Sequence, residues 1–274
     1  MNWHARTKCV HIVSLEGWER QVKKVLIVGY GEVGKPLFEI VRGVYPEVEW
    51  LDIQSKNVTI HPDIMHITYP EQNPNTFIED SVQYIRRFNP KLVLIESTVT
   101  PGTTLRIHAT VSNVPLCHSP VRGNMTEGVK RGLLQYTKFI GPTSDEAGSR
   151  AAEHYGSLGI KTHICSSPLE TELGKLFETT YRGLMMSWFQ EINRICRNLN
   201  AQYDEIVEFV GSTEREGKQA RPIFHPGVIG GHCIIPNAEK LYSTYHSKFA
   251  EALLESNKKR EQEVADEHSR TSQH

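Results

Sequence analysis

Cysteine is scarce in this sequence, and no two cysteines lie close together. The five stand at positions 9, 117, 165, 196 and 233. An odd number with no short-spaced pair argues against a disulfide framework and against a zinc site. We therefore expect free thiols and no bound metal.

The sequence also lacks long apolar runs and an excess of either charge. No apolar stretch reaches the roughly 18 residues that a membrane helix needs, and the early residues Glu16, Glu19 and Arg20 do not fit a signal peptide. The 31 basic and 32 acidic residues leave a net charge of -1, so no broad field attracts phosphate backbones or anionic lipid. These absences predict a cytoplasmic protein that binds neither nucleic acid nor membranes.

Short β-branched runs alternate with longer amphipathic stretches from Lys24 onward. This alternation is typical of strand–helix units in a parallel sheet, and it predicts strands at residues 25–28, 48–52, 64–67, 92–95, 116–118, 139–141 and 162–165. The 274 residues, 38% of them hydrophobic, suffice for this domain and a smaller second one. The predicted class is α/β: a Rossmann-type doubly wound parallel sheet followed by a smaller all-helical domain.

The helical domain is expected to open with a long helix. Ser167 to Glu170 form a capping box with proline at the first helical position, and the helix should run to about Asn200. Apolar residues recur along it at three- and four-residue spacing, giving one wide stripe. It would span on the order of 45 Å, longer than a small domain needs. We therefore expect helix 168–200 to pair with its copy in a homodimer.

Four parts of the chain are expected, namely an N-terminal extension (1–22), the sheet domain (23–166), the helical domain (167–255) and a polar tail (256–274). An apolar fragment in the extension, residues 9–15, could add an edge strand. Further helices are expected from Asp204 to Val210 and at a last segment that buries Leu241, Tyr242, Tyr245, Phe249 and Leu253. The tail is charged and polar, so we expect it to be disordered.

Residues 25–34 combine a strand, a Gly-x-Gly-x-x-Gly turn and a helix start. Gly29 permits the tight turn, Gly31 lets the backbone approach a pyrophosphate, and Gly34 lets the helix pack on the strand. Asp52 ends the next strand, where a carboxylate binds a ribose diol and repels a 2′-phosphate. A turn without cofactor also uses glycine, but Asp52 favours NAD. The expected cofactor residues are Gly29, Tyr30, Gly31, Glu32, Val33, Gly34, Asp52, Ser97 and Thr98.

Two segments bear hydroxyl or amine groups at expected ligand-binding positions. Residues 96–104 follow a central strand, where open α/β sheets bind ligands, so their hydroxyls could meet the nicotinamide ribose or a substrate. They could equally cap a helix. Lys175 lies on the long helix with Thr179 one turn later on the same face. A lysine there could polarise a substrate oxygen, whereas a solvated surface charge is the ordinary alternative.

A third segment, residues 230–237, contains two glycines and Cys233 just ahead of the last helix. The glycines allow close approach to a ligand, and Asn237 is expected to cap the helix. Cys233 would then lie near the helix N-terminus, where the dipole favours the thiolate, as a nucleophile requires. The competing interpretation is a small buried hydrophobic residue.

Several motifs occur in a fixed order between Lys24 and Leu241. They are the Gly29/Gly31/Gly34 turn, Ser97-Thr98-Val99-x-Pro101-Gly102-Thr103-Thr104, Ser119-Pro120-x-Arg122, Glu172-Leu173-x-Lys175, and Phe224-x-Pro226-Gly227 leading to Gly230-Gly231-His232-Cys233. This set resembles the UDP-glucose/GDP-mannose dehydrogenase family. Such enzymes oxidise the primary alcohol of a nucleotide sugar to a carboxylate in two NAD-dependent steps, with a cysteine that carries the substrate as a thiohemiacetal and then a thioester.

The resemblance implies Cys233 as that nucleophile, Lys175 as the stabiliser of the oxyanion and Thr98 as a residue that positions water. Three positions depart from the family pattern. Val121 stands for a glutamate, Thr179 for an asparagine and Asn237 for an aspartate.

The sequence also ends where the family continues into a second nucleotide-binding domain, so we expect a sugar-like small-molecule substrate without specifying it. Two alternatives remain open. One is a non-catalytic NAD-binding homodimer, and the other is an enzyme of the 6-phosphogluconate or β-hydroxyacid dehydrogenase class that uses Lys175.

Overall fold

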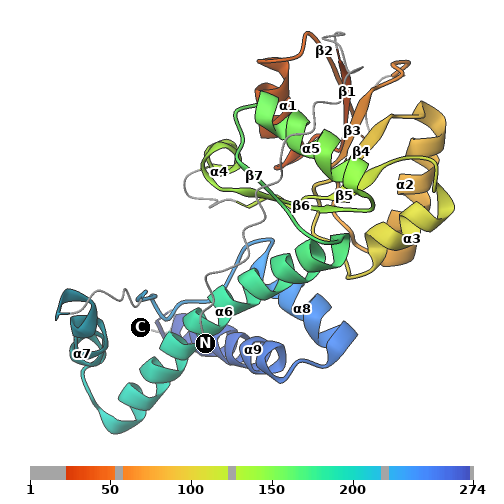
Figure 1. Cartoon of the computed structure of the whole chain (residues 1–274). Helices are drawn as coiled ribbons and strands as arrows, with labels where there is room; N and C mark the ends of the chain where they lie inside the picture. The colour runs from red at the N-terminus through yellow and green to blue at the C-terminus, as the bar shows by residue number, and fades with distance from the viewer. Residues whose placement is uncertain (1–22, 53–57, 123–127, 217–221, 272–274) are drawn as a thin grey trace.

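The computed structural model describes residues 23–52, 58–122, 128–216 and 222–271. Figure 1 shows a sheet domain and a helical domain, with one long helix leading from the first into the second. The expected edge strand at 9–15 lies outside the described residues. None of the helices in the described ranges is both long and apolar enough to cross a membrane.

The sheet domain contains seven strands in the order β2-β1-β3-β4-β5-β6-β7. Their bounds are Lys24–Val28 (β1), Glu47–Leu51 (β2), Ile64–Ile67 (β3), Leu92–Ile95 (β4), Leu116–His118 (β5), Lys138–Pro142 (β6) and Thr162–Ile164 (β7). All neighbouring pairs are parallel except β5 and β6, which run antiparallel. The predicted α/β fold is therefore confirmed, with the fully parallel sheet corrected at this one pair. The strand order reverses between β1 and β3, which is where open α/β sheets bind ligands.

Helices cover both faces of the sheet, so its central strands are apolar along most of their length. Val25 and Ile27 face one core, formed with α1 (Gly34–Arg42) and α5 (Asp145–Ser157). Leu26 and Val28 face the other, formed with α2 (Pro74–Phe88) and α3 (Thr103–Thr110). A short helix, α4 (Val129–Gln135), packs beside α1. Burial on both faces explains why these strands read as continuous apolar runs.

The helical domain is built on α6 (Pro168–Leu199), close to the predicted 168–200. Ser167 caps it by accepting a hydrogen bond from the amide of Leu169 at 3.2 Å. The helices α7 (Tyr203–Glu216), α8 (Ile234–Tyr245) and α9 (Lys248–Thr271) follow. Helix α9 packs tightly on α6, because a Cβ at Gly183 would lie 2.3 Å from a methyl group of Leu253.

The last part of the chain differs from the sequence-based expectation. A left-handed residue, His246 (φ 50°), divides the expected last helix into α8 and α9. Tyr245 and Phe249, expected to be buried, are 49% and 71% exposed. The prediction of a disordered tail is wrong, since α9 continues to Thr271. Its charged side chains have partners on α6, and such long-range pairs are not visible in a local sequence pattern.

Candidate functional site

The glycine-rich turn between β1 and α1 has the close packing that its motif predicts. Gly29 has φ +100°, and a Cβ there would lie 2.7 Å from the amide nitrogen of Tyr69. A Cβ at Gly34 would lie 1.9 Å from the carbonyl oxygen of Gly29, so no side chain fits where α1 meets β1. A Cβ at Gly31 would meet no atom within 4 Å. The two outer glycines serve the turn itself, and Gly31 borders open space.

Asp52 lies beside this turn, directly after β2. Its Oδ2 accepts a hydrogen bond from the amide of Tyr30 at 3.1 Å. The ring of Tyr30 stacks on Trp50 of β2 with the centroids 4.1 Å apart. Glu32 is exposed and Val33 half-buried at the N-terminus of α1. The predicted cofactor residues of β1 and β2 therefore surround one turn at the point where the strand order reverses.

The loop after β4 is held by two buried carboxylates rather than by its own hydroxyls. Glu71, after β3, accepts hydrogen bonds from the amide of Thr100 at 3.0 Å and from its hydroxyl at 2.7 Å. Glu172 of α6 accepts from the amides of Gly102 at 2.6 Å and Thr104 at 2.9 Å. Glu172 therefore caps α3, a role that the sequence suggested for serine or threonine. Burial raises the pKa of Glu172, although its two amide donors act in the opposite direction.

Ser97 and Thr98 occupy the start of this loop. The Ser97 hydroxyl donates to the carbonyl oxygen of Tyr69 at 2.6 Å, so it fixes the neighbouring loop. Its own carbonyl lies 3.0 Å from Nε2 of His118, whose Nδ1 lies 2.7 Å from the hydroxyl of Thr171 on α6. Burial lowers the pKa of His118 to about 3, so the neutral ring joins the loop to the first turns of α6. Thr98 is half-buried at the same edge.

Lys175 and Thr179 lie on one face of α6, as their spacing predicts. The side chain of Lys175 is 12% exposed, with Nζ 3.6 Å from Glu178. The hydroxyl of Thr179 donates to the carbonyl oxygen of Lys175 at 3.0 Å and accepts from Nδ2 of Asn237 at 3.1 Å. Asn237 is buried within α8 and does not cap it, so that prediction is wrong. The side chain instead connects α8 to α6.

Cys233 is the N-cap residue of α8 and is half-buried. The helix thus starts four residues earlier than a cap at Asn237 would require. Gly231 has φ +88°, a conformation that favours glycine. Cys233 lies at the positive end of the helix dipole, as its predicted role needs.

A salt bridge and a longer contact between a histidine and a carboxylate connect the helical domain to the sheet domain near these residues. Nζ of Lys240 on α8 lies 2.6 Å from Oε1 of Glu71. Nε2 of His232, the residue before Cys233, lies 3.8 Å from Oε1 of Glu32 in the glycine-rich turn. Helix α8 and the residue before Cys233 therefore contact α6, the loop after β3 and the glycine-rich turn.

A charged cluster lies in the sheet domain beneath this edge. The carboxylate of Glu96, fully buried, bonds Nδ1 of His66 at 2.8 Å, the hydroxyl of Tyr155 at 2.7 Å and the ammonium of Lys138. Burial alone would raise the pKa of Glu96, but the charge of Lys138 and the His66 hydrogen bond outweigh it and lower the pKa to about 2. His154 extends the cluster, 3.0 Å from His66. This carboxylate stabilises the fold and is not positioned to meet a ligand.

Sequence reasoning missed several residues that hold the site together. Glu71 and Lys240 belong to no motif and meet only through the fold. Glu172 was part of a quoted motif, yet its capping role depends on a helix 68 residues away along the chain. The described residues contain no group of three or more His, Cys, Asp or Glu side chains that could hold a metal ion.

Comparison with known proteins adds a second line of information. Residues 169–260 match the model of the UDP-glucose/GDP-mannose dehydrogenase family, central domain. The resemblance of the motifs to the UDP-glucose/GDP-mannose dehydrogenase family is therefore confirmed. It is 23% identical over 236 residues to the UDP-N-acetyl-D-mannosamine dehydrogenase of Methanocaldococcus jannaschii, covering 81% of this chain and 54% of that protein.

Other relatives agree with this resemblance. The enzyme of the same name from Methanococcus maripaludis strain C7 is 27% identical over 187 residues, covering 66% of this chain and 42% of that protein. Among solved structures, the UDP-D-ManNAc dehydrogenase of Pyrococcus horikoshii superposes with a TM-score of 0.76 at 18% identity, covering 89% of this chain and 70% of that one. The chain thus spans about half the length of the curated relatives it matches.

Proposed function

We propose that this chain is an NAD-dependent dehydrogenase of a nucleotide sugar, with Cys233 as the covalent nucleophile and Lys175 as the stabiliser of the oxyanion. The observation that carries the proposal is the position of the α8 N-terminus. Asn237 bonds Thr179 at 3.1 Å on the helix of Lys175, and His232 lies 3.8 Å from Glu32 in the glycine-rich turn. These contacts set the Cys233 loop between the proposed cofactor turn and α6.

The residues of the turn fit NAD. Open space at Gly31 leaves room for a pyrophosphate to approach the backbone, where the amides and dipole of α1 stabilise its charge. A carboxylate accepts several hydrogen bonds, so the bond from Tyr30 to Asp52 is compatible with a ribose diol. Ser97 and Thr98 line the adjacent strand end. Bound NAD would accept the hydride.

The proposed chemistry assigns separate steps to the protein side chains. The primary alcohol of the substrate would first lose a proton to solvent and a hydride to NAD, which gives an aldehyde. The Cys233 thiolate adds to the aldehyde carbon and forms a thiohemiacetal, whose oxyanion Lys175 stabilises. Loss of a second hydride, to a second NAD, would give a thioester, which water hydrolyses to the carboxylate and the free thiol. Thr98 is proposed to position this water. Val121 packs against an apolar core and offers no carboxylate to activate it, so slow thioester hydrolysis is expected.

Three variants test this function. NADH formation is followed with UDP-N-acetylmannosamine and with UDP-glucose. Cys233→Ala is expected to abolish the second oxidation, whereas Cys165→Ala, another half-buried cysteine directly after β7, should leave the rate unchanged. Turnover that survives Cys233→Ala but not Lys175→Ala would favour the β-hydroxyacid dehydrogenase class. NAD binding without NADH formation from either substrate would favour a non-catalytic NAD-binding homodimer.

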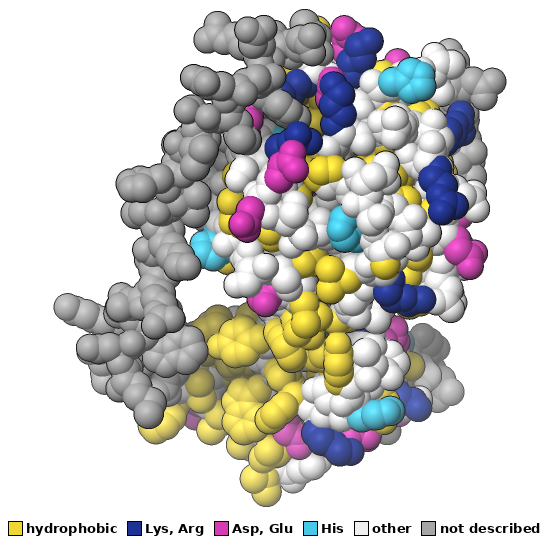
Figure 2. All heavy atoms as spheres, turned by 45° about the vertical axis from the view of Figure 1, so that its right-hand side comes forward, with side chains coloured by type: hydrophobic (Ala, Val, Ile, Leu, Met, Phe, Trp, Pro, Cys, Tyr) yellow, Lys and Arg dark blue, Asp and Glu magenta, His cyan; other side chains and the backbone are white. Residues whose placement is uncertain are grey.

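We also propose a homodimer, because α6 has an exposed apolar face. Figure 2 shows hydrophobic side chains gathered over the helical part of the molecule. Side chains at helical spacing along one face of α6 are 48% to 73% exposed, namely Phe177, Tyr181, Trp188, Ile195 and Leu199. A contiguous apolar stripe of this length is typical of an interaction surface. The second copy of the same stripe is the proposed partner, in an isologous contact.

Light scattering of separated species tests the dimer. Trp188→Glu introduces a charge in the middle of the stripe and is expected to give a monomer. Val44→Glu, at a side chain 46% exposed on the sheet domain, is the matched control and should leave the mass unchanged. A wild-type monomer at micromolar concentration, or a Trp188→Glu dimer, would contradict this interface.

A further inference from the structure

Two buried amide side chains hold the chain just ahead of Cys233. Asn257 of α9 accepts a hydrogen bond from the amide of Ile229 at 2.7 Å and donates Nδ2 to the carbonyl oxygen of the same residue at 3.3 Å. Gln190 of α6 donates Nε2 to the carbonyl oxygen of Gly227 at 2.8 Å. Asn257 therefore pairs with both polar backbone groups of one residue, as a neighbouring strand would.

The orientation of both amides is determined by their remaining contacts. Oδ1 of Asn257 also lies 3.4 Å from Nε2 of Gln190, and its Nδ2 donates to Glu261 at 3.0 Å. Oε1 of Gln190 accepts from the hydroxyl of Ser256 at 2.8 Å. Asn257 thus uses both donors and both acceptor positions. Asn257 is 3% exposed and Gln190 1% exposed, so water does not compete for these bonds.

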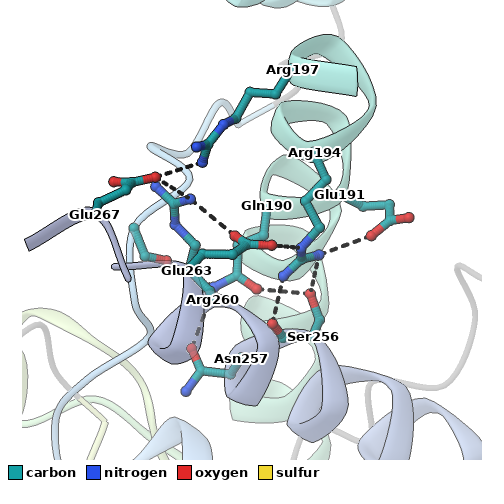
Figure 3. Close-up of polar contacts among 10 residues, drawn as sticks. Gln190, Glu191, Arg194, Arg197, Ser256, Asn257, Arg260, Glu263 and Glu267 are labelled. Atoms are coloured by element: carbon teal, nitrogen blue, oxygen red, sulfur yellow. Dashed lines mark hydrogen bonds and ion pairs between the residues drawn. The ribbon is translucent and has the colours of Figure 1, made fainter. Parts of the chain in front are cut away.

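The guanidinium group of Arg194 connects α6 to α9 beside the two amide side chains. Figure 3 shows Arg194 on α6 reaching across to α9, beside Gln190 and Ser256. It donates to the carbonyl oxygen of Ser256 at 2.7 Å and to Glu263 at 2.7 Å. These bonds fix α9 against α6 at the residue before Asn257. The polar end of α9 is thus part of the support for the loop.

The position of Ile229 decides what this clamp can do. Three residues separate it from Cys233, so the two lie at most about 14 Å apart along the chain. Gly230 and Gly231 lie between them, and glycine has the largest backbone freedom of any residue. On the other side of Cys233, Ile234 packs against the core of α6, α8 and α9. Without the bonds to Ile229, the segment ahead of Cys233 keeps only the bond of Gln190 to Gly227 and the longer contact of His232 with Glu32.

We propose that Asn257, backed by Gln190, is a positioning residue that fixes the loop carrying Cys233 through the backbone of Ile229. Its catalytic consequence rests on the proposed function of Cys233, whereas its effect on loop order does not. Displacement of a reacting group by about 1 Å lowers rates by up to a hundredfold. Loss of the clamp should therefore reduce kcat and leave the Kd for NAD unchanged, because the glycine-rich turn is held by its own packing and by Asp52.

Hydrogen–deuterium exchange tests the clamp without any substrate. In Asn257→Ala the amide of Ile229 loses its acceptor, so we expect faster exchange in the peptide covering residues 225–233. Gln262→Ala is the control, because it removes an exposed amide from the same helix, bonded only within α9 to Asp266 at 3.0 Å. Equal exchange in Asn257→Ala and Gln262→Ala would overturn the proposal.

Kinetics and rescue separate positioning from a merely structural role. Asn257→Ala is expected to lower kcat about tenfold to a hundredfold with an unchanged Kd for NAD. Asn257→Asp keeps the acceptor for the amide of Ile229 but loses the donor to its carbonyl oxygen and faces Glu261, so adding Glu261→Gln should restore slow exchange of that amide and part of kcat. Faster exchange with unchanged kcat would refute the link to Cys233. An inactive wild type would refute the proposed function alone, and exchange would still decide whether the clamp orders the loop.

Discussion

Lys138→Met removes the only lysine or arginine charge paired with the fully buried carboxylate of Glu96 in the described residues. Methionine has a similar length, so the substitution removes charge and little volume. Breaking a buried ion pair by removing one partner costs about 3–5 kcal/mol. A change of about 1 kcal/mol moves Tm by about 2–4 °C in a domain of 150–250 residues, so Tm should fall by roughly 6–20 °C.

The pH dependence of this loss follows from the pKa of Glu96. In the wild type the folded-state pKa is about 2, against a usual value of 4.5. The stability that Glu96 contributes is therefore present above pH 4.5 and lost as the pH falls toward 2. Without the charge of Lys138, burial raises the pKa of Glu96 instead, and the ionised form of this carboxylate becomes unfavourable in the folded protein. The difference between Lys138→Met and wild type should thus begin to narrow as the pH falls through the raised pKa of Glu96 in the variant, and narrow further below pH 4.5.

Urea unfolding followed by circular dichroism measures these changes. Glu96→Gln added to Lys138→Met removes the unpaired charge, so the double variant should be more stable than Lys138→Met by about 2 kcal/mol. Lys130→Met is the control, since its pair with Glu39 is more than half exposed and contributes under about 1 kcal/mol. A Lys138→Met loss no greater than that of Lys130→Met, or a double variant no better than Lys138→Met, would refute the reasoning.

Two further predictions concern the glycine-rich turn and the connection between the domains. Gly34→Ala places a Cβ 1.9 Å from a carbonyl oxygen, so both Tm and the affinity for NAD should fall. In Gly31→Ala the new Cβ meets open space, so Tm should not change. The Kd for NAD, measured by calorimetry, should rise at least about tenfold in Gly31→Ala. Unchanged affinity in Gly31→Ala would argue against a pyrophosphate there. Lys240→Met leaves Glu71 buried without its cation and should cost about 3 kcal/mol in urea unfolding. Adding Glu71→Gln should recover most of this loss, and an additive double variant would contradict the pairing.

The sequence by itself was enough to predict the strands, helices and turns that depend on residues close together in the chain. The strands read as apolar runs because both faces of the sheet are buried, and their positions agree with the prediction to within one residue at each end. The serine cap and the apolar stripe predicted helix α6. The steric demands of one tight turn explain why glycine stands at positions 29 and 34. The order of the motifs was also enough to predict the family resemblance.

Only the tertiary structure decided which polar residues meet. Lys240 and Glu71 are 169 residues apart in the sequence, and neither has a local pattern that distinguishes it from a surface charge. Asn257 is 28 residues from Ile229 and lies in a segment whose composition alone predicted disorder. Burial makes these pairs strong, and burial depends on how α6, α8 and α9 pack together. A residue whose role depends on a distant partner leaves no periodic signal, so the supports of the site became visible only in the fold.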